Sequence, residues 1–145
     1  MERVRELLGQ VSTMTLATSD IDGKPHATPV YFVHDKDLKL YFFSDEKSQH
    51  CQNFAHNPHV AAAIYPECAG WQDIKGLQIR GEVRWVESPE VWDSAWEEYQ
   101  RKFRFVRTLK AVVAQNKMYV LIPSWIRLVD NSQGFGFKKE WGFHE

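Results

Sequence analysis

The chain has 145 residues, a formal net charge of −1 at pH 7, and a composition that is 43% hydrophobic and 26% charged. This length suits one domain, here residues 1–145, and the composition is that of an ordinary globular protein rather than a disordered one. The near-neutral charge argues against a nucleic-acid partner, and no apolar run approaches the ~20 residues that a membrane span requires.

The two cysteines, Cys51 and Cys68, form neither a CxxC pair nor a disulfide framework, which fits a reducing compartment. The first six residues carry charges of both signs and lack the apolar core of an export signal. We therefore expect a cytoplasmic protein.

The first half of the chain predicts a short amphipathic helix followed by an antiparallel meander. The expected helix covers residues 3–8, and the expected strands are 14–19, 26–34 and 38–44. A second helix is expected from Ser48 to Asn57, because Pro58 cannot continue it. The next predicted strand, 60–65, is nearly all apolar and is expected to be buried on both faces.

The second half predicts one long alternating strand, a helix and further short strands. In the strand 77–86, Trp85 shares the parity of Leu77 and Ile79 and is expected on the same face. Ser88 and Pro89 mark a helix start. The remaining strands are expected at 118–122, 125–130 and 135–141, with Pro123 breaking the chain between the first two.

The helix that starts at Ser88 carries aromatic residues spaced four, three and four apart. They are Trp92, Trp96, Tyr99 and Phe103. This 3.6-residue period is typical of a core face, and we interpret the stripe as packing rather than as a ligand wall.

We expect a mainly β fold of six to seven antiparallel strands closed into a small barrel, with the short helices packed outside. Closure removes the open edges that a flat sheet of this size would expose. Side chains would fill the interior of so small a barrel. Any ligand is therefore expected on the outside, against a second subunit.

The turn between the strand ending at Ser44 and the helix at Ser48 concentrates polar groups. Ser44, Lys47, Ser48 and His50 lie within seven residues. The unpaired N–H groups of a helix start favour an anion, and phosphate is a common one. The alternative is a solvated loop with an ordinary helix cap at Ser48.

A proline within the strand 26–34 removes one ladder donor, so this strand is expected at an edge or at a bulge. A flat heterocycle with imide edges could pair with its free backbone groups. The alternative is an edge proline without a ligand.

The sequence motifs of metal, serine hydrolase and nucleotide-binding sites are absent. His50 and His56 are six residues apart, and there is no HExxH or Cys/His quartet, so no metal site is expected. The chain also contains no GxSxG, GxGxxG or Walker sequence.

An ordered series of short segments resembles the FMN-binding split-barrel superfamily of pyridoxamine 5′-phosphate oxidase. The segments are Leu16-Ala17-Thr18, Gly23-Lys24-Pro25, Thr28-Pro29-Val30, Tyr41-Phe42-Phe43-Ser44, Ser48-Gln49-His50, Asn57-Pro58-His59-Val60 and Gly81-Glu82-Val83. The ending, 130–136 with Trp141, resembles a short and mostly uncharacterised branch of that superfamily.

The resemblance implies a homodimer with two FMN sites in the cleft between its subunits. The strand matching the family's flavin strand holds Thr28, Pro29, Val30 and Tyr31. The turn matching its phosphate and ribityl site holds Phe43, Ser44, Ser48, Gln49 and His50. Trp141 would reach the neighbouring subunit's site.

The chain departs from the oxidase at the residues that carry charge. Thr28 stands where the oxidase has an arginine, and Gln49-His50 stands where it has Arg-Lys. Charge at the phosphate would then come from Lys47, from protonated His50 or from the neighbouring subunit. The oxidase's C-terminal substrate signature is absent, so oxidation of vitamin B6 is not expected.

We therefore expect an FMN-dependent oxidoreductase acting on an unidentified small molecule, with flavin supplying the redox chemistry. Two alternatives remain open. One is a flavin- or haem-binding carrier or sensor without turnover, and the other is a barrel that binds nothing and uses its aromatic residues for dimerisation.

Overall fold

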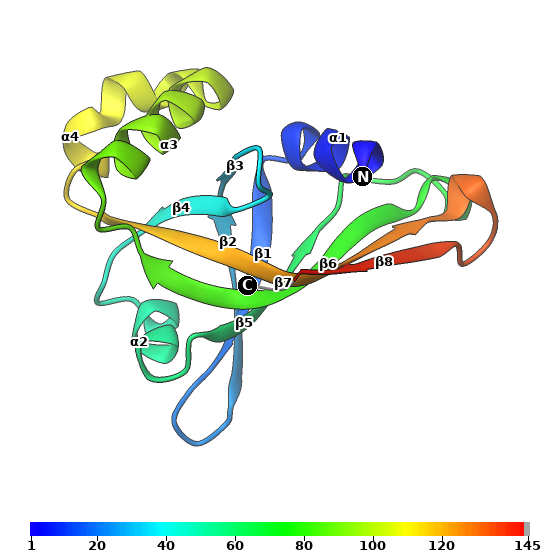
Figure 1. The fold of residues 1–145 in the computed structure, drawn as a ribbon, viewed down its shortest axis with the longest axis horizontal. Coiled ribbons are helices and arrows are strands. Elements are labelled where there is room, and N and C mark those ends of the chain that lie inside the picture. Colours follow the sequence, from blue (N-terminus) through cyan, green and yellow to red (C-terminus); the bar gives the residue numbers. More distant parts are fainter. Residues whose placement is uncertain (144–145) are drawn as a thin grey trace.

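The computed structural model describes residues 1–143, apart from the side chain of Val112. Eight strands form one antiparallel sheet, and the helices lie outside it (Figure 1). The strands are β1 (Thr13–Ser19), β2 (Pro25–Tyr31), β3 (Val33–His34), β4 (Leu40–Ser44), β5 (His59–Ile64), β6 (Lys75–Trp85), β7 (Lys117–Asp130) and β8 (Lys138–Gly142). The α-helices are α1 (Glu2–Gln10), α2 (Gln49–His56), α3 (Pro89–Lys102) and α4 (Lys110–Val113), and the 3₁₀ turns are η1 (Trp71–Asp73), η2 (Arg104–Leu109) and η3 (Asn131–Gln133).

The sheet curls until its two ends meet. Its strand order is β2-β1-β5-β6-β7-β4-β3, with β8 added on the side of β7. The first and last strands of this path, β2 and β3, are joined by the single residue Phe32, whose side chain is fully buried. The mainly β barrel expected from the sequence is confirmed in this curled form.

The expected single strand over residues 26–34 is wrong in one respect. Phe32 divides it, so β2 pairs with β1 and β3 pairs with β4. The chain must leave one end of the sheet and enter the other, and a straight strand cannot do both. The edge position expected for Pro29 is confirmed, since β2 pairs only with β1.

Strand β7 runs through Pro123, so the expected break there is wrong. The β6–β7 register shifts between Arg80 and Gly81, opposite Pro123 and Trp125. A bulge tolerates proline because one residue of the bulged strand needs no ladder partner.

Two further expectations about burial are wrong. Strand β5 alternates between exposed and buried residues, because its outer face is not covered. Trp85 is 51% exposed, whereas Val86 is buried, because β6 ends at Trp85 and the chain turns there.

The buried residues form two clusters on opposite faces of the curled sheet. The inner cluster joins Val4, Leu7 and Leu8 of α1 to the inward-facing residues of the strands. The outer cluster joins α3 to the outer faces of β4 and β7. No helix among residues 1–143 is long and apolar enough to cross a membrane.

The aromatic stripe of α3 supplies the outer cluster, as predicted. Ser88 caps this helix by accepting a hydrogen bond from the N–H of Val91. Trp96, Tyr99 and Phe103 are buried, and Trp92 is half-buried. The ring of Trp96 stacks 5.7 Å from that of Trp92.

We predict that Trp96→Ala lowers the free energy of unfolding by about 3–5 kcal/mol, because it leaves a large cavity between α3 and the sheet. Trp71→Ala is the matched control, since Trp71 is 56% exposed. Urea denaturation of both variants measures the difference. Equal losses in the two variants would show that the stripe does not hold α3 on the sheet.

Candidate functional site

The turn from Ser44 to His50, which we call the Ser44–His50 corner, joins the end of β4 to the start of α2. Its backbone is held by Asp45, whose carboxylate accepts from the N–H of Lys47 at 2.9 Å and whose carbonyl accepts from the N–H of Ser48 at 2.9 Å. Ser48 then caps α2 by accepting from the N–H of Cys51 at 3.4 Å. The corner is therefore a compact turn built by two short polar side chains.

Two hydroxyls meet the His50 imidazole. Its Nε2 lies 2.8 Å from Ser44 Oγ and 3.3 Å from Ser48 Oγ. Ser44 is buried, whereas Ser48 and His50 are half-buried. The structure thus brings together three of the residues singled out in the sequence.

The charge on His50 is set by its surroundings. Burial lowers the pKa of the His50 imidazole, and electrostatic interaction with the nearby His26 lowers it further. The ring is therefore mainly neutral at pH 7. If the ring proton is on Nε2, this atom donates to a serine oxygen, and if it is on Nδ1, Nε2 accepts from a serine hydroxyl. This leaves Lys47 as the permanent cation of the corner.

Lys47 and Gln49 are more exposed to solvent than His50 is. Both side chains are exposed. The Lys47 ammonium makes no ion pair within residues 1–143, whereas the Gln49 amide donates to Asn53 Oδ1 at 2.8 Å, one turn along α2. Lys47 is thus free to reach a ligand, and Gln49 is engaged along the helix.

The backbone of α2 offers further donors. The N–H groups of Gln49 and His50 have no acceptor among the described residues, as expected for the first turn of a helix. These donors and the Lys47 ammonium favour a negatively charged group at this end of α2.

The inner wall of the corner was not anticipated from the sequence. The Cys51 thiol lies within hydrogen-bonding reach of Ser48, Tyr119 and Ser44, and burial raises its pKa. Burial likewise raises the pKa of the Tyr119 hydroxyl. The spacing of Cys51 three residues after the Ser48 cap places it on this wall, but nothing in the sequence pairs it with Tyr119 of β7.

Strand β2 presents one open edge. The N–H of Phe32 donates to Ser12 at 3.2 Å, so even-numbered residues direct their backbone towards β1. Pro29 and Tyr31 therefore face away from β1. The Tyr31 carbonyl accepts from the Tyr99 hydroxyl at 2.7 Å, which confirms this orientation.

The side chains of β2 differ in exposure. Thr28 is half-buried, Pro29 is exposed, and Val30 is buried in the inner cluster. Tyr31 is 50% exposed and packs edge-on against Phe105, with ring centroids 5.7 Å apart. An aromatic surface therefore flanks the open edge of β2.

Phe43 and Trp141 lie apart from the polar groups of the corner. The Phe43 ring packs against Trp92, Trp96 and Tyr99, so only its backbone borders the corner. Trp141 lies on β8 opposite Ile126, whereas the corner adjoins the other end of β7 at Lys117. One chain thus does not bring Trp141 to the corner.

Among residues 1–143, no group of three or more His, Cys, Asp or Glu side chains is arranged to hold a metal ion. The chemistry available at the corner is hydrogen bonding from hydroxyls, amides and one ammonium. This set is suited to binding an anion.

Two solved structures share the fold. HutZ, a haem storage protein from Vibrio cholerae, aligns with a TM-score of 0.72 and 19% identity over 84% of this chain and 88% of its own. A haem-binding protein from Mycobacterium smegmatis aligns with a TM-score of 0.79 and 20% identity over 97% of this chain and 57% of its own.

The sequence has relatives among curated proteins. The UPF0306 protein YhbP of Salmonella newport (strain SL254) is 30% identical over 115 residues, which cover 79% of this chain and 74% of that protein. The family model described as pyridoxamine 5′-phosphate oxidase matches residues 1–130. The chain therefore belongs to the pyridoxamine 5′-phosphate oxidase family.

Proposed function

We propose that this chain is an FMN-binding oxidoreductase that acts on an unidentified small molecule. The observation that carries the proposal is the position of the Ser44–His50 corner, which leads into α2, a helix that lies beside the strand with the open edge, β2. Helix α2 packs beside β1 and β2, so a phosphate donor set and a free strand edge lie on neighbouring elements.

The residues present fit the two ends of FMN. The first-turn amides of α2, Ser48 and Lys47 would hold the phosphate. The Pro29 carbonyl and the Tyr31 N–H would pair with the polar edge of the ring, since Pro29 has no N–H and the Tyr31 carbonyl already accepts from Tyr99. The exposed faces of Tyr31 and Phe105 offer an aromatic wall beside it.

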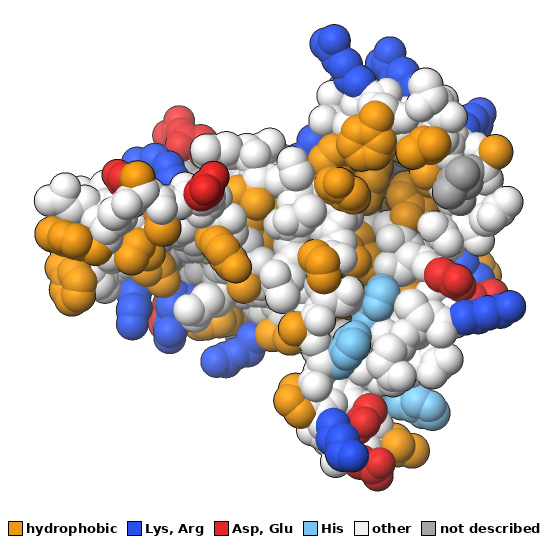
Figure 2. Space-filling model, turned by 180° about the vertical axis from the view of Figure 1, so that it is seen from behind, with side chains coloured by type: hydrophobic (Ala, Val, Ile, Leu, Met, Phe, Trp, Pro, Cys, Tyr) orange, Lys and Arg blue, Asp and Glu red, His pale blue; other side chains and the backbone are white. Residues whose placement is uncertain are grey.

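The region beside this edge is apolar on the surface. Figure 2 shows hydrophobic side chains gathered under the helical part of the molecule, with histidine side chains below them. Tyr31, Phe105 and Leu109 contribute exposed apolar surface to this part of the chain. A planar ring would be shielded from water here and a phosphate would remain near the polar corner.

Bound flavin would supply the hydride or electron transfer. The chain's own contributions are binding and orientation. His50, neutral at pH 7, would hold the Ser44 and Ser48 hydroxyls in place, and the buried Cys51 and Tyr119 would keep water from the inner side of the corner.

A carrier or sensor role is the second candidate, because two relatives of the same fold are described as haem-binding or haem storage proteins. The exposed His26 lies close enough to His50 to lower its pKa, which places an imidazole suitable as an axial ligand near the corner. This role requires binding without turnover.

The purified protein is expected to absorb as oxidised flavin, and this absorption is expected to bleach with NAD(P)H and return in air. A haem Soret band in place of the flavin spectrum would favour the carrier role. Flavin absorption that does not bleach with any donor would support binding without turnover, and a protein that takes up neither ligand would contradict both candidates.

We predict that Ser44→Ala combined with Lys47→Ala lowers FMN occupancy about tenfold or more without unfolding the domain, since it removes a hydroxyl and the exposed cation. Equilibrium dialysis with FMN measures the loss, and circular dichroism checks the fold. Full occupancy in the double variant would contradict the phosphate assignment.

A cap variant separates FMN binding from stability. Ser48 and Ser88 each cap a helix through a 3.4 Å hydrogen bond, and each loss is worth about 0.5–2 kcal/mol. Ser48→Ala is expected to lose stability and FMN, whereas Ser88→Ala is expected to lose stability alone.

We further propose that the chain acts as a cytoplasmic homodimer. On the outer face of β6 and β7, the Trp125 ring lies 4.3 Å from the Arg80 guanidinium and 5.0 Å from that of Arg127. Tryptophan and arginine are enriched at subunit interfaces. The two cysteines are free, Cys51 buried and Cys68 exposed, which fits a reducing compartment.

Sedimentation is expected to give the mass of a dimer, and Trp125→Ala is expected to shift it towards the monomer. Trp141→Ala leaves the corner of its own chain intact and is expected to weaken FMN binding, because Trp141 would reach the partner's site. A monomeric protein with full FMN occupancy would contradict the dimer and the role of Trp141.

A further inference from the structure

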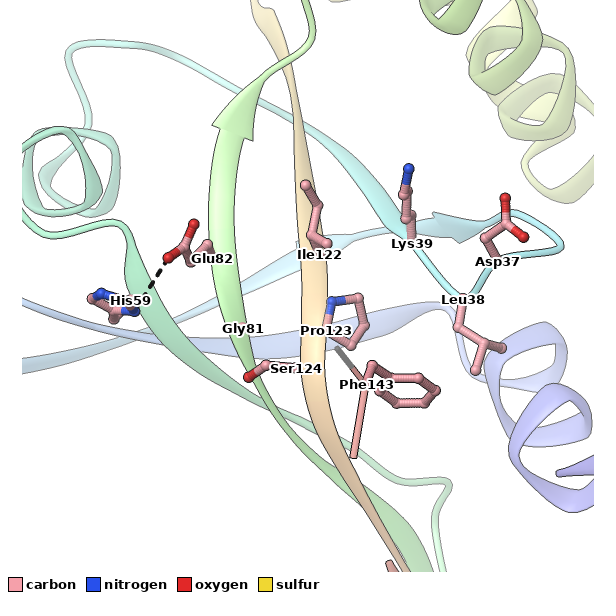
Figure 3. A pocket seen from close by; sticks show the side chains of 10 residues that line it. All are labelled: Asp37, Leu38, Lys39, His59, Gly81, Glu82, Ile122, Pro123, Ser124 and Phe143. Atoms are coloured by element: carbon pink, nitrogen blue, oxygen red, sulfur yellow. Dashed lines mark ion pairs between the residues drawn. The ribbon is translucent and has the colours of Figure 1, made fainter. Parts of the chain in front are cut away.

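A cavity of about 380 Å³ lies away from the Ser44–His50 corner and shares no lining residue with it. It lies where the β3–β4 turn, the start of β5 and the middle of β6 and β7 meet (Figure 3). Its volume is within the range of ~300–1,000 Å³ that is typical of small-molecule sites.

The floor of the cavity exists because β6 and β7 depart from regular pairing. A Cβ atom on Gly81 would lie 2.2 Å from the backbone oxygen of Ile122, so only glycine permits this approach. The register shift at Arg80 and Gly81 bends the strands, and Pro123 opposite Gly81 offers no N–H group. The bulge thus leaves a hollow that a regular ladder would not contain.

One wall of the cavity is formed by Leu38, whose backbone conformation is unusual. Leu38 has a φ of 65°, in the left-handed region that a γ-branched residue rarely adopts. The turn is held by Asp35, whose carboxylate accepts from the N–H groups of Asp37 and Lys39 at 2.9 and 3.0 Å. As a result Leu38 is buried at the side of the cavity where Phe143 lies (Figure 3).

Charged side chains occupy both sides of the mouth. Figure 3 shows Asp37 and Lys39 on one side and His59 and Glu82 on the other. His59 Nδ1 lies 3.7 Å from Glu82 Oε1 across the β5–β6 ladder, and the Arg84 guanidinium lies 3.3 Å from Glu82 Oε2.

The two charges on the turn side are uncommitted. The Lys39 ammonium and the Asp37 carboxylate make no hydrogen bond or ion pair with any residue from 1 to 143. Lys39 is only partly exposed. Its ammonium therefore has no counter-ion among the described residues.

We propose that this cavity binds a small zwitterion with an apolar body, such as a free amino acid with an aromatic or aliphatic side chain. The ligand's carboxylate would pair with Lys39, and its ammonium would pair with Asp37, because Glu82 already pairs with Arg84. Its side chain would lie on Pro123 and Phe143, which separate the two charged sides.

The charges of the mouth favour a zwitterion over a simple ion. An anion would meet the Asp37 carboxylate, which has no cationic partner among residues 1–143, whereas Glu82 is already balanced by Arg84 at 3.3 Å. A cation would leave the Lys39 ammonium unpaired. A zwitterion satisfies charges of both signs, and the apolar floor adds burial of its side chain.

The probe is L-phenylalanine, compared with 3-phenylpropionate, which lacks the ammonium, and with phenethylamine, which lacks the carboxylate. Titration followed by amide NMR shifts is expected to show saturable binding of L-phenylalanine. Its affinity is expected to exceed that of either analogue by about tenfold. The shifts are expected at Gly81, Ser124 and Phe143. Equal affinities, or no saturable binding at millimolar concentrations, would overturn the proposal.

Lys39→Met keeps the apolar stem and removes the charge, so it is expected to weaken L-phenylalanine about tenfold and leave phenethylamine unchanged. Lys24→Met, in the exposed β1–β2 turn, is the matched control and is expected to change neither. Unaltered binding of L-phenylalanine to Lys39→Met would also overturn the proposal.

A third comparison separates this site from the flavin site. The double variant Ser44→Ala and Lys47→Ala is expected to bind L-phenylalanine as the native chain does, because the cavity shares no residue with the corner. Loss of L-phenylalanine binding in that variant would place the ligand at the corner and overturn the assignment to this cavity.

Discussion

The structure depends on the point where the two ends of one sheet are joined by a single buried residue. Phe32 connects β2, at one end of the strand order, to β3, at the other end. The Lys102 ammonium lies 4.0 Å from its ring and donates to the carbonyls of Leu8 and Val11, so α1 and α3 are fastened to the same place. Closure at this residue leaves β2 with one partner and one open edge.

That open edge and the Ser44–His50 corner both lie outside the curled sheet. The interior is filled by the inner cluster, and the outer faces of β4 and β7 are covered by α3. The edge of β2 and the turn into α2 are among the surfaces that neither cluster covers. Ser44, Ser48 and His50 meet there because β4 ends where α2 begins, and the neutral imidazole links the two hydroxyls without adding charge.

Departures from regular strand pairing create the cavity beside β6 and β7. Gly81 and Pro123 bring β6 and β7 together in a bulge, and Leu38 adopts a left-handed conformation beside it. Each feature has a local cost, since backbone of this kind loses ladder bonds or strains a side chain. They converge on one cavity, whose mouth carries charges of both signs.

The sequence by itself determined the local features: the caps at Ser48 and Ser88, the aromatic face of α3, the edge position of Pro29 and the polar turn after Ser44. These depend on hydrogen bonds and periodicity within a few residues. Only the tertiary structure decided the division at Phe32, the passage of β7 through Pro123 and the neutrality of His50. It also decided the contact of Cys51 with Tyr119. Each of these arises from contacts between strands that are distant in the chain. Neither residue propensity nor motif spacing specifies which strands become neighbours in the sheet.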